Sequence, residues 1–493
     1  MVKILHYCLL ILLCSLPLLL TSSILFLKDP PIWPDEPVFY EMAQNFLSTG
    51  KLASNLYIGT ASEVAETGFG YPPLYFGLLG IWTGIFGSSI ESVRSLSLIL
   101  GLSCLSVFFF LIRNLFKSNF LSVLGTLVLA FQVHFSRSSR IGRMEILTLL
   151  LLLGSLFMLQ VAEEKKKLYL YFLIGLISAL ATLSHPMGII SPIIIFFYLL
   201  FTSSNFKEKI IHLCLVSLPV ILLNIFWLIV TKVNLLFLLS TYQGHLQDKA
   251  PKLPYAVVLF QTDFSWWFLF ILYIVLFIVF LGFIKKMGQK EYLLILISVF
   301  VSFILSLWGR EGCYIIYFQP FIILIALFLL NIGQKLNSQT LRKTVLAIIS
   351  LIILASLNIQ FFNNDNIAIT RGGLRTIFDI AAVDYHLFGK EIIKKLPADQ
   401  PTNILISSLP DPYFDLKEIN QFRFYEAPDP FFPISKENYK KVLDSTDYLV
   451  ITWFPQQFLK DYVDKNSETI TTINPPNSYQ ALLIKLKPRT NRQ

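Results

Sequence analysis

Residues 71–86 read YPPLYFGLLGIWTGIF, and this short stretch decides how the rest of the chain is arranged. Its apolar part, Leu74–Phe86, is about 13 residues long, whereas a helix needs about 20 apolar residues to cross a bilayer. If the stretch does not cross, every later loop keeps the side that the longer apolar segments give it. If it crosses, every later loop changes sides.

The whole chain has the composition of a membrane protein. It has 493 residues, of which 55% are hydrophobic and 14% charged, and its mean hydropathy is +0.65. An average soluble protein is about 25% charged, so this composition excludes a cytosolic enzyme, a fibrous protein and a disordered scaffold. No long basic run is interleaved with aromatic residues, so nucleic acid is not expected as a partner despite the net charge of +9.

Eleven segments are long and apolar enough to predict membrane-spanning helices. They lie approximately at Ile4–Leu27, Val93–Ile112, Phe120–Phe135, Met144–Val161, Leu168–Ser184, Gly188–Phe201, Ile210–Val230, Trp266–Ile284, Tyr292–Trp308, Tyr314–Asn331 and Leu341–Phe361. The predicted fold class is an α-helical polytopic membrane protein with about eleven spanning helices, interfacial helices in the first outer loop and a C-terminal α/β extracytoplasmic domain.

The positions of lysine and arginine decide the side of each loop. All the basic loops fall on one side if Leu74–Phe86 does not span the membrane. They contain Arg113 and Lys117; Lys165, Lys166 and Lys167; Lys207 and Lys209; Lys285, Lys286 and Lys290; and Lys335, Arg342 and Lys343. The positive-inside rule places that side, with the N-terminus, in the cytoplasm. We therefore predict that Leu74–Phe86 lies in the outer interface of the cytoplasmic (inner) membrane, where membrane lipids contact it.

With this topology the unusual polar residues, and everything after Phe361, collect on the outer face. These residues are Asp35, Glu36, Arg94, Arg140, Arg143, Glu145, His185 and Arg310. The outer face has no nucleotide pool, so an enzyme there takes its activated substrate from a membrane carrier.

The composition turns polar from about Asn363. This change predicts a transmembrane domain over residues 1–361 and a soluble extracytoplasmic domain over residues 362–493. The pattern predicts helices at 374–396, 436–443 and 456–463, and strands at 403–407, 448–452 and 479–486. A small α/β domain is the conclusion, and it contains no nucleotide-binding loop and no GxSxG motif.

An acidic pair precedes an amphipathic helix in the first outer loop. Trp33-Pro34-Asp35-Glu36-Pro37 is followed by apolar residues at helical spacing from Val38 to Leu47. Two interpretations stay open. Asp35 or Glu36 caps the helix, with Pro37 in its first turn, or the pair contains a general base held at the bilayer surface.

Several motifs, taken in order along the chain, resemble a known superfamily. They are Asp35-Glu36, Tyr40, Ala43, Leu47 and Gly50; Tyr71-Pro72-Pro73-Leu74-Tyr75; Phe86-Gly87 and Arg94; Arg140-Ile141-Gly142-Arg143-Met144-Glu145; His185-Pro186; and Arg310 with Tyr314, Tyr317 and Pro320. The set is similar to the polytopic C-type glycosyltransferase superfamily, which contains the dolichyl-phosphate-mannose protein mannosyltransferases and the lipid A aminoarabinose transferases.

The resemblance implies roles for the acidic residues. Asp35 matches the catalytic base, Glu36 its frequent companion, and Glu145 an outer-loop acid that binds metal or orients the acceptor. A divalent metal ion is therefore a candidate cofactor, with Glu145 and His185 as candidate ligands. One departure is visible. Gly70-Tyr71 stands where the aminoarabinose transferases have a Glu-Lys pair, so a metal ligand and a phosphate-binding lysine are missing there.

The arginines agree with the chemistry of a polyprenyl phosphate leaving group. Such a group develops negative charge, and guanidinium groups pair with two phosphate oxygens at once. Arg94, Arg140, Arg143 and Arg310 are cations at outer helix ends and are predicted to bind the donor phosphate. The alternative is contact with lipid headgroups by snorkelling at the interface.

Tyr71, His185, Tyr314 and Tyr317 complete the candidate set, as substrate-binding residues. His185 precedes Pro186 between two apolar segments, so it is a candidate ligand for a metal ion or a sugar hydroxyl. The alternative for a lone histidine at a turn is a hydrogen-bonded structural role.

The sequence thus predicts a membrane glycosyltransferase. It would transfer a monosaccharide, hexosyl or pentosyl, from a polyprenyl-phosphate-linked donor to a hydroxyl of a glycan, lipid or protein acceptor, with inversion and with Asp35 as general base. The alternative is a lipid or sugar transporter or flippase, since intramembrane ionisable residues also mark transport paths. The sequence lacks the two matching halves usual in that class. A third interpretation is an assembly subunit without chemistry.

Overall fold

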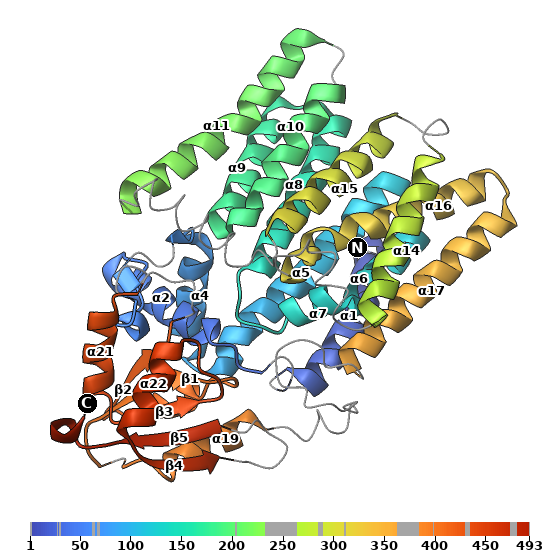
Figure 1. Cartoon of the computed structure of the whole chain (residues 1–493). Coiled ribbons are helices and arrows are strands. Elements are labelled where there is room, and N and C mark those ends of the chain that lie inside the picture. The colour runs from blue at the N-terminus through green and yellow to red at the C-terminus, as the bar shows by residue number, and fades with distance from the viewer. Residues whose placement is uncertain are drawn as a thin grey trace.

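The computed structural model describes residues 2–26, 28, 31–61, 65–66, 70–202, 205–231, 264–283, 289–309, 312–361, 384–397, 399–428, 434–473 and 481–492. In these residues the chain forms a helical bundle and a smaller domain built on a β-sheet. The helices of the first outer loop lie between the two (Figure 1).

The bundle follows the order of the predicted apolar segments. Its helices are α1 (Val2–Leu25), α5 (Ile90–Phe116), α6 (Asn119–Phe131), α7 (Val133–Ser138), α8 (Glu145–Lys165), α9 (Leu168–Ser184), α10 (Ile190–Thr202), α11 (Phe206–Thr231), α14 (Phe264–Leu281), α15 (Gln289–Gly309), α16 (Gln319–Lys335) and α17 (Gln339–Phe361). Judged by length and composition alone, six helical stretches of the described chain could cross a membrane. They are Leu5–Leu25, Ile90–Phe116, Glu145–Lys165, Phe206–Val230, Tyr314–Lys335 and Gln339–Ser356. Eleven as the number of spans stays a prediction.

One predicted segment, Phe120–Phe135, is divided in the structure. The chain leaves the helical conformation at Gln132, which separates α6 from α7. The buried side-chain oxygen of Gln132 accepts hydrogen bonds from the Tyr273 hydroxyl (2.9 Å) and from Nε2 of Gln319 (3.1 Å). The interruption therefore places a polar group where it joins α14 and α16 to the centre of the bundle, as hydrogen-bonding side chains do between membrane helices.

Small residues and hydroxyls join helices α8 to α11. Ser191 lies between Ser155 (2.7 Å) and Ser178 (2.9 Å), with all three hydroxyl oxygens buried. A Cβ at Gly175 would lie 2.4 Å from the carbonyl oxygen of Val216, so glycine allows α9 and α11 to touch. Close backbone approach and hydroxyl pairs are typical of helix contacts in membranes.

The first outer loop contains two helices, α2 (Asp35–Thr49) and α4 (Leu74–Phe86), and a short 3-10 turn, η1 (Asn55–Tyr57). Helix α4 has the bounds expected from the sequence. It packs on α2 through Gly80, where a Cβ would lie 2.8 Å from the Ala43 carbonyl oxygen. Ile81 and Ile85 of α4 remain exposed, at 55% and 69%, which suits a helix with one face in a membrane interface.

The C-terminal domain is a five-stranded mixed sheet with helices. Its elements are α19 (Tyr385–Ile393), β1 (Thr402–Ser407), α20 (Tyr413–Leu416), β2 (Phe422–Glu426), α21 (Lys436–Ser445), β3 (Tyr448–Ile451), α22 (Gln457–Asn466), β4 (Ser467–Ile473), β5 (Ala481–Leu486) and η6 (Arg489–Asn491). The strand order is β2-β1-β3-β5-β4. Strand β1 runs parallel to β2 and β3, whereas β5 runs antiparallel to β3 and β4. The α/β class expected from the sequence is therefore present.

Two strands of this sheet were absent from the expectations. Strand β2 contains two charged residues, and β4 is a largely exposed edge strand with only two apolar residues, so neither is an apolar run like those that predicted the other strands. Of the helix expected at 374–396, residues 374–383 lie outside the described chain and α19 forms the remainder. The other five expected elements match α21, α22, β1, β3 and β5.

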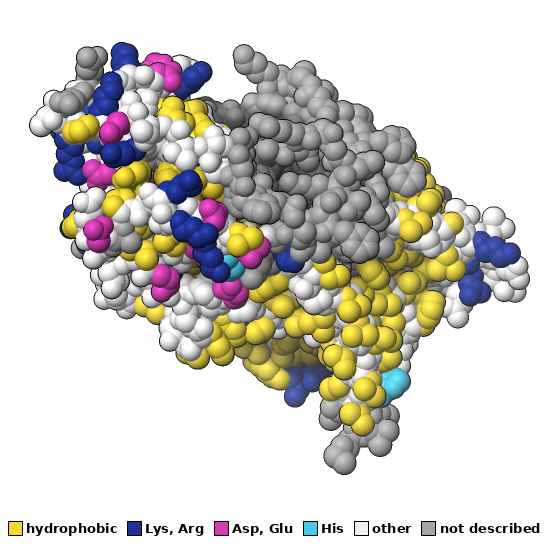
Figure 2. All heavy atoms as spheres, turned by 90° about the horizontal axis from the view of Figure 1, so that it is seen from below, with side chains coloured by type: hydrophobic (Ala, Val, Ile, Leu, Met, Phe, Trp, Pro, Cys, Tyr) yellow, Lys and Arg dark blue, Asp and Glu magenta, His cyan; other side chains and the backbone are white. Residues whose placement is uncertain are grey.

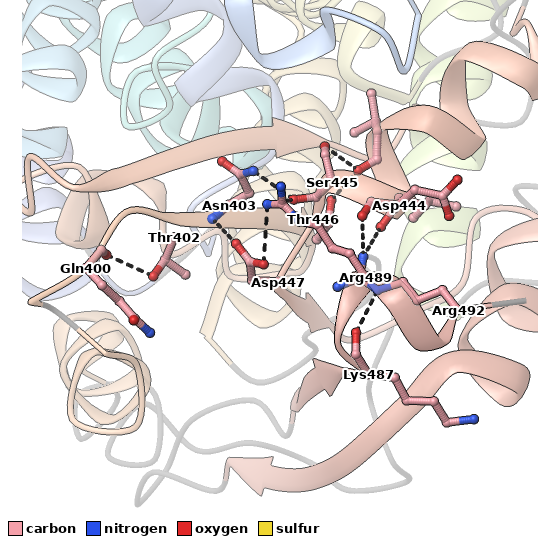
Figure 3. A network of polar contacts seen from close by, with 12 residues as sticks. Gln400, Thr402, Asn403, Asp444, Ser445, Thr446, Asp447, Lys487, Arg489 and Arg492 are labelled. Atoms are coloured by element: carbon pink, nitrogen blue, oxygen red, sulfur yellow. Dashed lines mark hydrogen bonds and ion pairs between the residues drawn. The ribbon is translucent and has the colours of Figure 1, made fainter.

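A polar network fastens the end of the chain to this sheet (Figure 3). The backbone N–H of Asn403 in β1 donates to Oδ2 of Asp447 (2.9 Å), and the Asn403 amide nitrogen donates to the Ser445 carbonyl (2.7 Å). Arg492 donates to the carbonyl of Asp444 (2.7 Å) in the last turn of α21, next to this loop. The loop between α21 and β3 is thus held from both the first strand and the C-terminal segment.

The bundle has two ends, and the loops alternate between them. At one end, Lys290 pairs with Glu163 (2.5 Å) and Lys117 with Glu164 (3.9 Å), so loops that carry the predicted cytoplasmic lysines lie together. The sheet domain lies at the other end (Figure 1). In Figure 2 acidic and basic side chains gather on the left, and hydrophobic side chains cover much of the described surface to their right.

Candidate active site

The acids, arginines and aromatic residues singled out from the sequence meet at the end of the bundle that faces the sheet domain. Asp35 and Glu36 form the first turn of α2, and Glu145 begins α8. His185 follows α9, and Tyr314 and Tyr317 belong to the 3-10 helix η5 (Gly312–Tyr317). Arg310 lies outside the described residues, so its predicted role stays a prediction.

Glu36 and Arg94 form a sealed ion pair. Nε and Nη2 of Arg94 donate to the two carboxylate oxygens of Glu36 at 2.9 and 2.7 Å, and both side chains are fully buried. Other N–H groups of Arg94 donate to the carbonyls of Phe26 (2.9 Å) and Pro31 (3.1 Å). This geometry favours a structural role for the pair over the catalytic role predicted for Glu36 and the phosphate-binding role predicted for Arg94.

Glu36 also fixes two segments of backbone. Its carboxylate accepts the N–H of Trp33 (2.9 Å), so Glu36 fixes the segment before α2, although no side chain caps the helix itself. The residue before α2 is Pro34, and the Asp35 side chain makes no capping bond. The other oxygen of Glu36 accepts the N–H of Gly142 (2.7 Å), which ties the segment before α8 to the first outer loop.

Arg143 forms a second, open pair beside the first. Its Nη1 donates to Oδ2 of Asp35 (2.7 Å), while Nε and Nη2 lie 3.0 and 2.9 Å from Oε1 of Glu145. Asp35 is 35% exposed and Arg143 15%, whereas Glu145 is only 2% exposed. Asp35 is therefore the acid of this cluster that reaches solvent, as a base that meets a substrate hydroxyl must.

Arg140 lies three residues before Arg143 in the chain and is fully buried. Its Nη1 donates to the hydroxyl of Ser136 (2.5 Å) in α7, and its backbone N–H to the Arg137 carbonyl (2.9 Å). Arg140 is therefore, with Arg94, a second fully buried guanidinium of the candidate set.

The four residues predicted to bind substrate form one aromatic cluster. His185 lies at its centre, with ring centroids 6.4 Å from Tyr71, 5.4 Å from Tyr314 and 6.4 Å from Tyr317. These rings come from the segment before α4, from the end of α9 and from η5. The structure thus brings together residues that are up to 246 positions apart, counting from Tyr71 to Tyr317.

His185 is hydrogen-bonded at the turn between α9 and η3 (Pro186–Ile189). Its Nδ1 accepts the backbone N–H of Met187 (3.0 Å), so the proton of the neutral ring is on Nε2. The preceding residue, Ser184, shares a hydrogen bond with Thr148 of α8 (2.7 Å), one turn after Glu145. The structural interpretation of His185 is therefore correct for Nδ1, and a role for the Nε2 edge stays a prediction.

Phe39 joins the charged cluster to the aromatic cluster. Its ring lies 5.7 Å from that of Tyr71 in an edge-to-face contact and 6.0 Å from the guanidinium carbon of Arg143. The result is one site in which a partly exposed carboxylate and a guanidinium lie beside aromatic rings, of which Phe39, His185 and Tyr317 are buried. Carboxylates accept protons, guanidinium groups bind phosphate and aromatic faces pack on sugar rings, so the arrangement suits glycosyl transfer.

The sheet domain docks beside this site. The Asp411 N–H donates to the Ile32 carbonyl (2.9 Å), and the Tyr413 hydroxyl donates to Oε1 of Glu41 on α2 (3.0 Å). The Lys417 ammonium donates to the Ser88 carbonyl and lies 3.9 Å from the centre of the Tyr40 ring. The C-terminal domain therefore holds the helix that begins with Asp35.

A histidine joins the two domains at a second point. Nδ1 of His386 lies 2.6 Å from Asp415, and its Nε2 lies 3.0 Å from Glu91 at the start of α5. These two carboxylates raise the pKa of His386 to about 10. Burial lowers the pKa of Lys417, in the same interface, to about 8.

Sequence reasoning missed several residues of this site. Gly142 enters the sequence analysis only as part of a motif, whereas in the structure its backbone N–H donates a hydrogen bond to Glu36. Phe39 was assigned to the apolar face of a helix, and no pattern in the sequence linked Tyr413 to Glu41. A glycine between Arg140-Ile141 and Arg143 was the one local signal, because it allows close approach of the backbone.

Comparisons with known proteins agree with the fold. Residues 71–227 match the family model of the dolichyl-phosphate-mannose-protein mannosyltransferases. An uncharacterized protein of Aquifex aeolicus (strain VF5) is 26% identical over 199 residues, and the matched part spans 40% of this chain and 38% of that protein.

Solved structures share the architecture over nearly the whole chain. ArnT from Cupriavidus metallidurans, bound to undecaprenyl phosphate, has a TM-score of 0.60 at 12% identity and covers 98% of this chain and 99% of its own. The oligosaccharyltransferase AglB from Archaeoglobus fulgidus, in complex with an inhibitory peptide and a dolichol-phosphate, has a TM-score of 0.54 at 11% identity, covering 98% of this chain and 74% of its own. The chain is therefore a multi-pass membrane protein with the fold of the C-type polytopic glycosyltransferases, and residues 71–227 resemble the dolichyl-phosphate-mannose-protein mannosyltransferases in sequence.

Proposed function

We propose that the chain is a membrane glycosyltransferase that takes a monosaccharide from a polyprenyl-phosphate-linked donor and transfers it to an acceptor hydroxyl. The proposal places the reaction at the outer face of the cytoplasmic membrane, with the N-terminus in the cytoplasm. The sugar, hexosyl or pentosyl, and the acceptor, which is a glycan, lipid or protein, are the finer parts of the hypothesis.

A single observation carries the proposal. The partly exposed carboxylate of Asp35, the guanidinium of Arg143 and the largely buried aromatic cluster around His185 lie next to one another, joined through the buried ring of Phe39. They come from segments that the chain brings to the same end of the bundle. The match to the mannosyltransferase family model supports transfer chemistry for this site. Nothing in the comparisons favours the transporter alternative.

The mechanism follows from the charges of the two reacting groups. Asp35 takes the proton of the acceptor hydroxyl while that oxygen forms a bond with the anomeric carbon of the donor sugar. The bond from the anomeric carbon to the phosphate oxygen breaks, and the polyprenyl phosphate leaves with the electron pair. Arg143 is placed to bind the phosphate oxygens as they gain charge. Attack opposite the leaving group inverts the anomeric centre.

The remaining groups position these reactants. Glu36 and Arg94 hold the start of α2 against the segment before α8, and Glu145 holds Arg143 from the buried side. Tyr71, Tyr314 and Tyr317 with His185 are proposed to contact the sugar, and Arg140 adds positive charge near the phosphate. Protein groups fixed in this way need little reorganisation when the charge develops.

The test is transfer by the purified chain in nanodiscs, with a set of radiolabelled undecaprenyl-phosphate-linked sugars and with membrane extract as the source of acceptors. Replacing Asp35 with Asn should reduce turnover by about 10²–10⁴-fold, because general-base catalysis typically contributes that much. Glu437→Gln, at an exposed site on α21, is the matched control and should leave turnover unchanged. Normal turnover in Asp35→Asn would remove Asp35 from the mechanism.

The divalent metal expected from the sequence stays a prediction. In the described part of the chain, no group of three or more His, Cys, Asp or Glu side chains could hold a metal ion. Oε1 of Glu145 already pairs with Arg143, and Nδ1 of His185 accepts a backbone N–H. This donor set does not by itself fit a resident metal, so no step of the mechanism is assigned to one. Assays with and without a chelator test the prediction.

A further inference from the structure

Two arginine–carboxylate pairs lie side by side at the candidate site, and they differ in exposure. Glu36 and Arg94 are completely buried, and Arg94 also donates to the backbone carbonyls of Phe26 and Pro31. Asp35 and Arg143 are partly exposed, at 35% and 15%. Only the second pair can exchange partners with a ligand from solvent or from the membrane surface, because the first would have to unfold its surroundings.

The guanidinium of Arg143 faces a buried carboxylate on one side and a partly exposed carboxylate on the other. Its Nε and Nη2 face Oε1 of Glu145, which is 2% exposed, and its Nη1 faces Asp35, which is the exposed acid. The backbone before it is held as well, since the Gly142 N–H donates to buried Glu36. A ligand that approaches from the exposed side therefore meets Nη1 first and competes with Asp35 for it.

We propose that the donor phosphate displaces Asp35 from Arg143, so that binding of the donor releases the catalytic base. The inference rests on the proposed function. Before donor binding, Oδ2 of Asp35 is held at 2.7 Å by Nη1 and is occupied as an acceptor. After the exchange, Nη1 binds a phosphate oxygen and Asp35 turns to the acceptor hydroxyl. Glu145 is the positioning residue that keeps Arg143 in place during the exchange.

The exchange gives an order to the reaction. Until the exchange, Oδ2 of Asp35 accepts a hydrogen bond from Arg143 and is turned away from an acceptor hydroxyl. The base becomes fully active only once the leaving group is bound. No proton is moved in the exchange itself, and the later step transfers the hydroxyl proton to Asp35 as the phosphate leaves with its electron pair.

A double-mutant cycle on the affinity for undecaprenyl phosphate tests the exchange without measuring turnover. If Asp35 competes with phosphate for Arg143, then Asp35→Asn should tighten binding by about fivefold, the range of a partly exposed ion pair. In an Arg143→Lys background, we expect the lysine ammonium to pair with buried Glu145 and not to reach Asp35. There, Asp35→Asn should change the affinity by less than about twofold.

The outcomes separate the possibilities. Equal tightening by Asp35→Asn in both backgrounds would mean simple charge repulsion and would overturn the exchange, as would no tightening in the native background. If Arg143→Lys fails to fold, Arg143→Gln with Glu145→Gln supplies a neutral background for the same comparison. If the native protein does not bind undecaprenyl phosphate at all, that result would instead overturn the proposed function. The Glu437→Gln and Lys441→Met variants, from an exposed ion pair on α21, control for charge changes at a distance.

Discussion

Gly142 is a residue at which a single added methyl group would disturb the charged part of the candidate site. A Cβ at this position would lie 2.3 Å from Cγ1 of Val93 and 3.2 Å from Oε1 of Glu36. The first distance is far below a normal contact, and the second atom accepts the hydrogen bond from the Gly142 N–H itself. An alanine would therefore push α5, or the Glu36 carboxylate, away from the segment that carries Arg143.

We predict that Gly142→Ala lowers the thermal unfolding midpoint in detergent, by an amount that corresponds to about 1–3 kcal/mol of overpacking. Gly154→Ala is the matched control, because the nearest atom to a Cβ there, Cγ2 of Ile177, is 3.9 Å away. That control lies in the middle of α8, where alanine is favoured over glycine, so its midpoint should stay equal or rise. Equal midpoints for the two variants would show that the contact at residue 142 relaxes freely.

The same residues show how far sequence reasoning reaches at this scale. The chain order and residue types were enough to single out Asp35, Arg143, Glu145 and His185, because buried or interfacial ionisable groups are rare in an apolar chain. Tyr71, Tyr314 and Tyr317 were singled out by the resemblance to the glycosyltransferase superfamily. The sequence could not tell the sealed pair from the open one. Arg94 is 58 positions from Glu36, and helical periodicity does not say which guanidinium meets a carboxylate inside the protein.

Helix α19 carries the contact between the sheet domain and the bundle that depends most on pH. His386 bridges Asp415 of α20 and Glu91 of α5, and these partners raise its pKa to about 10 from an ordinary value near 6.5. A group whose pKa is raised in the folded protein contributes stability that is complete below its unfolded pKa. The contribution is lost as the pH rises through the folded pKa.

We therefore predict that the stabilisation from His386 is complete below about pH 6.5 and is lost as the pH approaches 10. The measurement is the difference between the thermal midpoints of the native protein and His386→Gln at pH 6.5, 8 and 10, at constant ionic strength. The difference should be largest at pH 6.5 and should shrink steadily. A difference that does not change with pH would mean that His386 contributes through packing and neutral hydrogen bonds alone.

Elements also differ in how well a sequence predicts them. Helix α4 was predicted at its observed bounds, because Pro72 and Pro73 precede it and Gly87 ends it in an apolar run. Strand β4 was not predicted, since its side chains are mostly exposed and its register is set by pairing with β5. The break between α6 and α7 was also missed, because it depends on Gln132 meeting helices far away in the chain.

At the scale of the whole molecule, the placement of α4 decides which loops share a side. Because α4 packs on α2 and α5 instead of crossing the bundle, Asp35 lies on the same side as Arg143 and Glu145, joined by ion pairs. The sheet domain contacts that side through Asp411 and Tyr413. The lysine-rich loops near Glu163 lie at the opposite end. The orientation of these two ends relative to the cytoplasm follows from the positive-inside rule and stays a prediction.

The topology can be tested by cysteine labelling in a background with the five native cysteines replaced by alanine. Ser48 at the end of α2 and Gln400 before β1 are exposed on the side of the candidate site, and Lys167 before α9 is exposed at the other end. A membrane-impermeant maleimide applied to intact cells should label Ser48→Cys and Gln400→Cys. It should label Lys167→Cys only after the membrane is opened, because a charged reagent does not cross the hydrocarbon core.

Each possible failure of this experiment points to a different part of the argument. Labelling of Lys167→Cys alone in intact cells would show that the whole molecule has the opposite orientation. The site would then face the cytoplasm, where a carrier lipid is not needed. Labelling of Ser48→Cys and Gln400→Cys from opposite sides would contradict the docking of the sheet domain on α2. If both label from outside, the candidate active site also faces away from the cytoplasm. Asp35 belongs to the same helix as Ser48, and it pairs with Arg143, which pairs with Glu145.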